Sequence, residues 1–445
     1  MILAGRDIPA ADRASLPMAL IRFGQPKRSE FMDFDVIVLG AGIIGVSCAV
    51  QLQDRCLRVA LVDRRAPGEE TSFGNAGLIE SSSVVPYGFP RDLGTLLRYA
   101  KNRSTDLYWD YRALPHFASW LARFWWESSA ERLMAAARDM LPLIRQSMAE
   151  HDRLIQRAHL GHLARDSGWM DAFRTPREFS RQAQFAHSLA RTHGLRVAVL
   201  DAAALSAREP GIADGFCGAL HWQDPKSIVN PGELTKGYAR LFEANGGALL
   251  TGNATTLDAH ADAWIVQTTS GRISARQAVV ALGPWSDTVY GPLGYRIPLR
   301  AKRGYHMHYS PTRPMLQMPY VDAEQGYVVA PMEGRLRLTT GVEIARREAW
   351  PTGIQLERAE RAARPTFGLG HRMDASPWLG LRPCTPDMRP VIGPAPRHRG
   401  LWFAFGHNHH GLTLGPVTGR LLAEMMTGMP TFSDATPFRP ERFCH

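Results

Sequence analysis

An α/β fold made of two interleaved domains is predicted by three features of the sequence. A β-branched apolar segment, Phe34 to Leu39, leads directly into a glycine-rich turn, which indicates a buried strand followed by a helix. Residues 296–345 alternate apolar and polar side chains, a pattern typical of half-buried antiparallel strands. A last apolar strand over 401–405 and an amphipathic helix to Met426 then return the chain to the first sheet, so that the first domain is discontinuous.

The glycine-rich turn reads Gly40-Ala41-Gly42-Ile43-Ile44-Gly45, the G-x-G-x-x-G pattern in which glycines allow a tight turn and close approach of a diphosphate. We expect a helix over 43–53 and a second strand over 58–62. That strand ends at Asp63, whose carboxylate can accept hydrogen bonds from ribose hydroxyls. The unit predicts a dinucleotide site, and on this evidence alone both NAD and FAD remain open.

Composition and charge exclude several classes of protein. The chain has 445 residues, with 45% hydrophobic and 21% charged, which are ordinary globular values. Its formal charge of +10 would attract nucleic acid or an anionic membrane, but the basic residues form no runs and only five of the 52 are lysines. Five scattered cysteines predict no disulfide framework, and hence a reducing, cytoplasmic location. We expect no membrane span and no secretory signal.

The loop after Asp63 makes a family resemblance specific. It contains the pattern T-S-x-x-N-x-G-x-I over residues 71–79, which resembles the flavin-contacting loop of the D-amino-acid oxidase family of flavoproteins. The segments G-L-R-P (380–383), T-P-D (385–387), P-V-I-G (390–393) and G-H-x-x-x-G-L-T (406–413) are similar to that family as well. The resemblance covers roughly residues 33–430 and identifies the cofactor as FAD.

The resemblance implies the residues that contact the cofactor. FAD is expected to be non-covalent, because Gly380 stands where sarcosine-oxidase relatives carry the attaching cysteine. Backbone amides at Gly411, Leu412 and Thr413 would face the flavin's pyrimidine carbonyl from a helix N-terminus. The complete predicted set is Gly40, Gly42, Ile43, Ile44, Gly45, Asp63, Arg64, Arg65, Thr71, Ser72, Asn75, Ala76, Gly77, Leu78, Ala254, Gly283, Trp285, Gly411, Leu412 and Thr413.

Three residues are implied on the substrate side. Arg382 would hold the substrate carboxylate, with a structural ion pair as the alternative. Tyr305 is a candidate pocket hydroxyl, with simple packing as the alternative. His409 stands where glycine-oxidase-like members place a second arginine, so a two-arginine clamp is in doubt.

The histidines also admit a metal interpretation. His306 and His308, with His407, His409 and His410, include pairs at i, i+2, which share one face of a strand. No acid or cysteine accompanies them at ligand spacing, and we therefore expect no metal.

A helical, aromatic insertion is expected between about residues 84 and 165. Its cluster from Trp120 to Trp126 and a long helix around 133–155 are similar to bacterial D-amino-acid dehydrogenases in particular, which implies that electrons pass to a quinone or another carrier. The aromatic stripe is interpreted as core packing, with docking to a membrane surface or an electron acceptor as alternatives.

The resemblance implies FAD-dependent oxidation of the Cα–N bond of a small D-amino acid or imino acid. An oxygen-using oxidase of glycine, sarcosine or a cyclic imino acid such as hydroxyproline is the nearest alternative, and an RNA- or membrane-binding flavoprotein and an NAD dehydrogenase are others.

Localisation is expected to be cytoplasmic, with peripheral contact at the inner membrane face. The expected FAD-binding domain comprises 33–85, 135–165, 226–290 and 380–430, the substrate domain comprises 86–134, 166–225 and 291–379, and residues 1–31 and 431–445 form a poorly ordered extension and a C-terminal tail.

Overall fold

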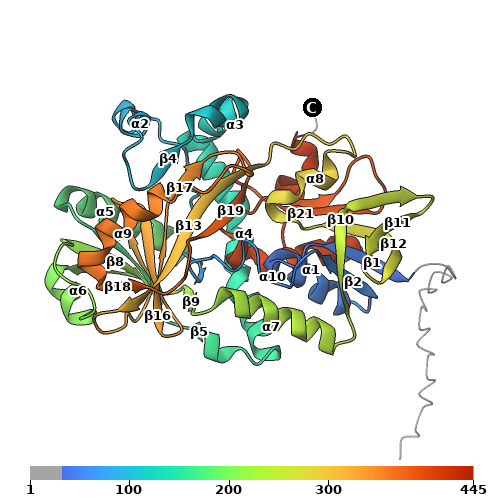
Figure 1. Cartoon of the computed structure of the whole chain (residues 1–445), viewed down its shortest axis with the longest axis horizontal. Coiled ribbons are helices and arrows are strands. Elements are labelled where there is room, and N and C mark those ends of the chain that lie inside the picture. Colours follow the sequence, from blue (N-terminus) through green and yellow to red (C-terminus); the bar gives the residue numbers. More distant parts are fainter. Residues whose placement is uncertain (1–32, 444–445) are drawn as a thin grey trace, which may run out of the picture.

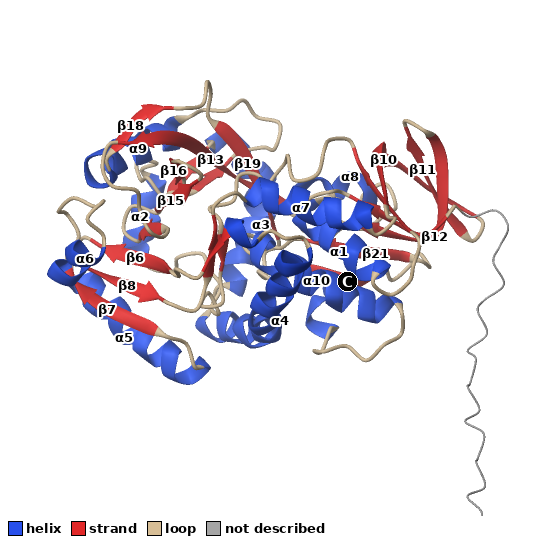
Figure 2. Ribbon diagram, turned by 90° about the horizontal axis from the view of Figure 1, so that it is seen from below, coloured by secondary structure: helices blue, strands red, loops and turns tan. Residues whose placement is uncertain are grey.

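The computed structural model describes residues 33–443, so the expected extension over 1–31 lies outside the described residues. The described chain forms two lobes that lie side by side, each built around its own sheet (Figures 1 and 2). This arrangement is a mixed α/β fold, as predicted.

The first lobe contains a seven-stranded sheet in which β1 (Phe34–Leu39) pairs in parallel with β2 (Val59–Asp63) and with β12 (Gly271–Val280). Parallel pairs also join β2 to β10 (Ala248–His260) and β12 to β21 (Leu401–Phe405). The antiparallel strands β11 and β20 complete the sheet; their bounds are Ala263–Thr268 and Val391–Pro394. The strand over 401–405 and its return to the first sheet are therefore confirmed.

Four helices share one hydrophobic core with this sheet: α1 (Ile43–Gln53), α4 (Ala130–Arg157), α7 (Pro231–Ala244) and α10 (Gly411–Met426). The predicted bounds of α1 and the predicted end of α10 are confirmed. Helices α1 and α10 cross closely, because a Cβ on Gly419 would lie 2.5 Å from the Ser47 carbonyl oxygen.

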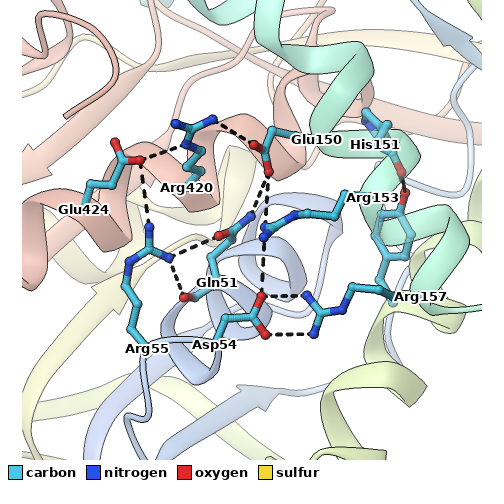
Figure 3. Close-up of polar contacts among 10 residues, drawn as sticks. Gln51, Asp54, Arg55, Glu150, His151, Arg153, Arg157, Arg420 and Glu424 are labelled. Carbon is cyan, nitrogen blue, oxygen red and sulfur yellow. Dashed lines mark hydrogen bonds and ion pairs between the residues drawn. The ribbon is translucent and has the colours of Figure 1, made fainter. Parts of the chain in front are cut away.

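A polar network ties three of these helices together (Figure 3). Arg157 of α4 binds Asp54 at the end of α1 through two contacts of 2.6 and 2.8 Å. Glu150 of α4 accepts from Gln51 of α1 at 3.1 Å and from Arg420 of α10 at 3.0 Å. The long helix expected around 133–155 is thus fixed to the nucleotide-binding unit.

The second lobe contains an eleven-stranded sheet, mostly antiparallel, centred on β13 (Arg300–Pro311). Strand β13 pairs with β16 (Arg335–Thr339), β17 (Val342–Ile344), β18 (Leu369–Arg372) and β19 (Trp378–Cys384). The remaining strands are β4 (Leu107–Trp109), β6 (Trp169–Phe173), β7 (Val197–Asp201), β8 (Gly218–Trp222), β14 (Tyr320–Asp322) and β15 (Tyr327–Met332). The antiparallel strands predicted within 296–345 are confirmed.

Short elements cover and connect this lobe. Helices α5 (Pro176–His193), α6 (Ala202–Arg208) and α9 (Ile354–Phe367) lie against its strands, and α2 (Leu93–Ala100) and α3 (Leu114–Glu127) form the aromatic insertion (Figure 1). A small sheet of β3 (Leu78–Ile79), β9 (Lys226–Ile228) and β5 (Ala164–Arg165) joins the lobes, and α8 (Asp287–Tyr290) follows the first sheet.

The second predicted strand is shifted by one residue, from the expected 58–62 to Val59–Asp63 in β2. Strand β10 extends as far as His260, and its outer half is exposed and polar, so this half carries no apolar signal in the sequence. The described part of the C-terminal tail, 431–443, includes the buried Phe438 and Phe443, which pack against the first lobe.

The aromatic stripe divides into two parts. Phe117, Trp120 and Phe124 of α3 are buried in one cluster with Trp109 and Cys384, which confirms the packing interpretation for this part. Trp125 and Trp126 are exposed. Within the described residues no helix is both long enough and apolar enough to cross a membrane.

Candidate functional site

One cavity of about 780 Å³ extends between the two lobes and brings together most of the predicted site residues. Arg382, Tyr305 and His409 all line it. The predicted cofactor residues on its wall are Gly40, Gly42, Ile43, Ile44, Asp63, Arg64, Thr71, Ser72, Asn75, Ala76, Leu78, Ala254, Gly283, Trp285, Gly411 and Leu412. The cavity volume lies in the upper part of the range of ligand pockets, roughly 300–1,000 Å³.

Four predicted cofactor residues, Gly45, Arg65, Gly77 and Thr413, do not line the cavity. A Cβ on Gly45 would lie 1.7 Å from the Gly40 carbonyl oxygen, so this glycine serves the packing of helix on strand. Gly77 has φ +80° and lies against Ile228. Arg65 is exposed and pairs with Glu70, whereas Thr413 is buried and its hydroxyl accepts from the Glu80 amide at 3.0 Å.

The nucleotide end of the cavity is built from the turn between β1 and α1. Asp63 accepts from the Ala41 amide at 2.6 Å and from the Arg65 amide at 3.0 Å, which holds the turn against the end of β2. The Ile43 amide donates to the Ser72 hydroxyl at 2.9 Å. The other first-turn amides of α1 have no intrahelical acceptor, and they lie at the positive end of the helix dipole.

This cradle fits a dinucleotide diphosphate. Gly40 has φ +107°, and a Cβ there would lie 2.5 Å from the Ala281 carbonyl oxygen, so only glycine allows the turn to pass this close to the neighbouring strand. A Cβ on Gly42 would meet only the Ser72 hydroxyl, at 3.4 Å, which leaves its cavity side open to a ligand. Helix α1 carries no acidic residue in its first turn, so nothing there repels a diphosphate.

The middle of the cavity is formed by the N-terminus of α10. A Cβ on Gly411 would meet nothing within 4 Å, so its backbone faces open space in the cavity wall. His151 of α4 lies behind this turn, with Nε2 2.8 Å from the Leu412 carbonyl oxygen and Nδ1 3.0 Å from the Tyr238 hydroxyl. Because a carbonyl only accepts, Nε2 carries the proton and Nδ1 accepts from Tyr238. Burial lowers the pKa of His151 to about 4, which keeps it neutral.

Arg382 lies on β19 at the substrate end. Its guanidinium donates to the carbonyl oxygens of Gly341, at 2.9 Å, and Thr340, at 3.1 Å, and packs over Gly304 of β13. Within residues 33–443 it forms no ion pair with a carboxylate, so the structural ion pair considered as its alternative is absent there. Burial lowers the pKa of Arg382, yet arginine stays charged in proteins. An unneutralised cation on the wall of a cavity favours an anionic ligand.

Tyr305 does not offer its hydroxyl to the cavity in this arrangement. The hydroxyl accepts from the Thr352 amide at 2.9 Å and from Arg303 at 3.2 Å, and the ring packs in a core cluster with Met307. Side chains alternate along β13, so Tyr305 points to the opposite face from Lys302 and Gly304. The geometry therefore favours packing, the alternative for Tyr305, over the predicted pocket role.

His409 lies on the cavity wall close to Tyr87 and Glu80, two residues that are distant from it in the sequence. Its ring centroid is 5.0 Å from that of Tyr87 and 3.9 Å from that of His410. Glu80, His409 and His410 each present a possible ligand atom within 4.8 Å of the others. An acidic residue therefore does accompany the histidines in the folded chain, because Glu80 reaches them from a distant loop. The expected absence of a metal stays a prediction.

Two half-buried carboxyl groups complete the wall. Burial raises the pKa of Glu80 to about 7 and that of Asp171 to about 7. Glu80 accepts from Ser83, and Asp171 accepts from the Trp222 indole at 3.2 Å. Neither carboxyl belongs to any motif, and hence only the folded chain reveals them.

Comparisons with known proteins agree with this geometry. A family model described as FAD dependent oxidoreductase (DAO) matches residues 35–425. The chain is 31% identical over 427 residues to a D-amino-acid oxidase of Bradyrhizobium diazoefficiens, covering 92% of this chain and 98% of that protein. It is 30% identical to a D-amino acid dehydrogenase of Paramagnetospirillum magneticum, covering 89% of this chain and 96% of that protein.

Solved structures show the same fold at lower identity. A glycine oxidase from Geobacillus kaustophilus superposes with a TM-score of 0.70 at 22% identity, covering 91% of this chain and 98% of that chain. An L-amino acid deaminase from Proteus vulgaris superposes with a TM-score of 0.70 at 18% identity, covering 92% and 97%. The extent of the family match, together with two relatives at 30% identity or more, establishes that this chain belongs to the DAO family of FAD-dependent oxidoreductases.

Proposed function

We propose that the enzyme oxidises the Cα–N bond of D-amino acids and passes the electrons to a quinone or another carrier. The observation that carries the proposal is Arg382, a cation without a carboxylate partner among the described residues, on the wall of the cavity that the cofactor residues line. The names of the relatives, a D-amino-acid oxidase and a D-amino acid dehydrogenase, support the choice of D-amino acids.

The protein's contribution is orientation and electrostatics. Arg382 would hold the substrate carboxylate through two parallel hydrogen bonds and so fix Cα. FAD, when bound, would supply the hydride acceptor for this oxidation, and the imine product would be hydrolysed by water to a 2-oxo acid and ammonia. First-turn amides of α10 at Gly411 and Leu412 would donate toward negative charge that develops on the bound ring.

Neutral histidines suit this chemistry. Burial lowers the pKa of His410 to about 4, and burial together with the neighbouring His410 and Arg382 holds the pKa of His409 well below its usual range. A neutral imidazole can accept a hydrogen bond from an amine through its unprotonated ring nitrogen. The protonated and ionised forms of Glu80 and Asp171 are both accessible near neutral pH, so either carboxyl could take up a proton that the substrate amine releases.

Anaerobic reduction of the bound flavin tests the proposal directly. We expect bleaching of the flavin absorbance by D-amino acids and none by their L-enantiomers, and an Arg382→Ala variant should keep its flavin while losing most substrate affinity. No bleaching by any D-amino or imino acid would refute the proposal. Peroxide formation in air, compared with reduction of a soluble quinone, distinguishes an oxidase from the proposed dehydrogenase.

A surface on α2 and α3 supports contact with a membrane that holds the electron acceptor. Leu93 is 77% exposed and Leu97 is 64% exposed, and no residue of α2 is buried. Arg91 lies 4.0 Å above the ring of Trp125, and Trp126 is 58% exposed. Exposed apolar side chains among arginines are typical of helices that lie on anionic bilayers.

Vesicle sedimentation tests this contact. We expect the protein to sediment with vesicles containing phosphatidylglycerol and not with pure phosphatidylcholine. A Leu93→Ser/Trp126→Ser double variant should stay in the supernatant at full activity with a soluble quinone. Equal sedimentation of wild type and variant would remove the surface from this role.

A further inference from the structure

A second cation stands beside Arg382 on the same face of the sheet. Lys302 of β13 is the register partner of Arg382 on β19, and both side chains line the cavity. Directly opposed residues of antiparallel strands point to the same side, with Cβ atoms roughly 4.5–5.5 Å apart. Lys302 is thus fixed next to the expected carboxylate site by backbone pairing and not by a mobile loop.

The two cationic groups diverge from this shared position. The Arg382 guanidinium packs over Gly304 and binds carbonyl oxygens on one side. The Lys302 ammonium lies 4.0 Å from the ring centroid of Phe124 and 5.0 Å from that of Trp120, both on α3. Their charged ends therefore define two anion positions, and one small carboxylate does not need both.

No protein carboxylate neutralises this pair within residues 33–443. Lys302 forms no ion pair there, and aromatic faces are its nearest partners. Burial, together with the charge of Arg382, lowers the pKa of Lys302. The positive charge of the Lys302 ammonium is therefore unfavourable unless an anion binds beside it. Glu80 and Asp171 lie elsewhere on the cavity wall, and their raised pKa values show that they do not supply two full negative charges to the cations at neutral pH.

We propose that the substrate is a D-amino dicarboxylate with one or two methylenes in its side chain, whose α-carboxylate binds Arg382 and whose second carboxylate binds Lys302. The proposal rests on the proposed function and names its substrate class. A ligand with two carboxylates supplies the two negative charges that the described protein residues do not. Gly304 lets the Arg382 guanidinium pack directly on β13, because a Cβ there would lie 2.5 Å from Nη1.

The test compares isosteric substrates that differ by one charge. We expect kcat/KM for D-glutamate to exceed that for D-glutamine by at least about tenfold, the factor that one charge-assisted hydrogen bond contributes. Lys302→Met keeps the apolar stem against Phe124, and in this variant the ratio should fall to about one while D-glutamine oxidation changes little. Lys302→Arg should restore much of the preference, and Lys236→Met, at a half-buried lysine outside the cavity, serves as the matched control.

Ligand binding without turnover gives a second readout. Glutarate should stabilise the FAD-loaded wild type against heat more than butyrate does, and Lys302→Met should abolish the difference. A ratio near or below one in the wild type, a preference for D-arginine, or equal losses for all substrates in Lys302→Met would overturn the proposal. Flavin reduction by D-glutamine or D-alanine in those cases would leave the proposed function intact, whereas no reduction by any substrate would refute both.

Discussion

Replacing Gly304 with alanine should displace Arg382 without disturbing the backbone. A Cβ at this position would lie 2.5 Å from Nη1 of Arg382 and 2.9 Å from its Cζ, whereas ordinary non-bonded contacts are about 3.5–4.0 Å. Gly304 does not have positive φ, so alanine is compatible with the strand. The guanidinium must move by roughly 1 Å, which breaks its alignment with the Gly341 and Thr340 carbonyl oxygens.

The size of the effect follows from the contact that is lost. A hydrogen bond to a charged group contributes about 1.5–3 kcal/mol, so kcat/KM should fall by about 10- to 150-fold, mainly through KM. Bound flavin per protein should be unchanged, because Gly304 does not touch the nucleotide end. Gly161→Ala is the matched control, since a Cβ there meets nothing within 4 Å. Wild-type kinetics in Gly304→Ala, or flavin loss equal to the loss of activity, would refute the reasoning.

Three further outcomes are expected. Asp63→Ala removes the acceptor of the Ala41 amide and should release flavin on gel filtration; full retention would contradict its role at the nucleotide end. Tyr305→Phe should leave kcat/KM within about twofold but lower the free energy of unfolding by about 1 kcal/mol, because Arg303 and the Thr352 amide lose an acceptor. His151→Gln should flatten the stability profile: with the folded pKa lowered to about 4, the unfolded state binds the proton first, so the wild type loses up to about 3 kcal/mol as pH falls from 6.5 to 4. A urea midpoint in the variant that falls over this interval as steeply as in the wild type would argue against the histidine.

The parts of the fold that could be predicted are those with local signals. The glycine pattern after a buried strand predicts both ends of α1 as observed. The strand over 401–405 and the end of α10 follow from apolar runs next to glycine turns. The site was less accessible. Side chains alternate along β13, so Tyr305 and Gly304 lie on opposite faces of the strand. Because the polar His306 is as buried as the aromatic Tyr305, the polarity of the side chains does not reveal which face lines the cavity.

Contacts between distant segments carried no sequence signal at all. Glu80 reaches His409 across more than 300 residues, and Lys302 meets Arg382 through strand register. Neither pair is encoded by spacing, because register is decided by which faces of the paired strands are buried. The helical insertion adds a third case, since Phe124 faces Lys302 only after α3 has docked on the sheet.

The proposed reaction requires Arg382 to be held at a fixed position relative to the N-terminal turn of α10. Cys384, at the end of β19, forms an isolated antiparallel bridge with His407, and the Asn408 amide donates to the Pro383 carbonyl oxygen at 2.9 Å. The strand that carries Arg382 and the turn that leads into α10 are therefore joined by backbone bonds. Side-chain changes at His409 leave these backbone bonds in place, so Arg382 keeps its position relative to the α10 turn whichever side chain stands at residue 409.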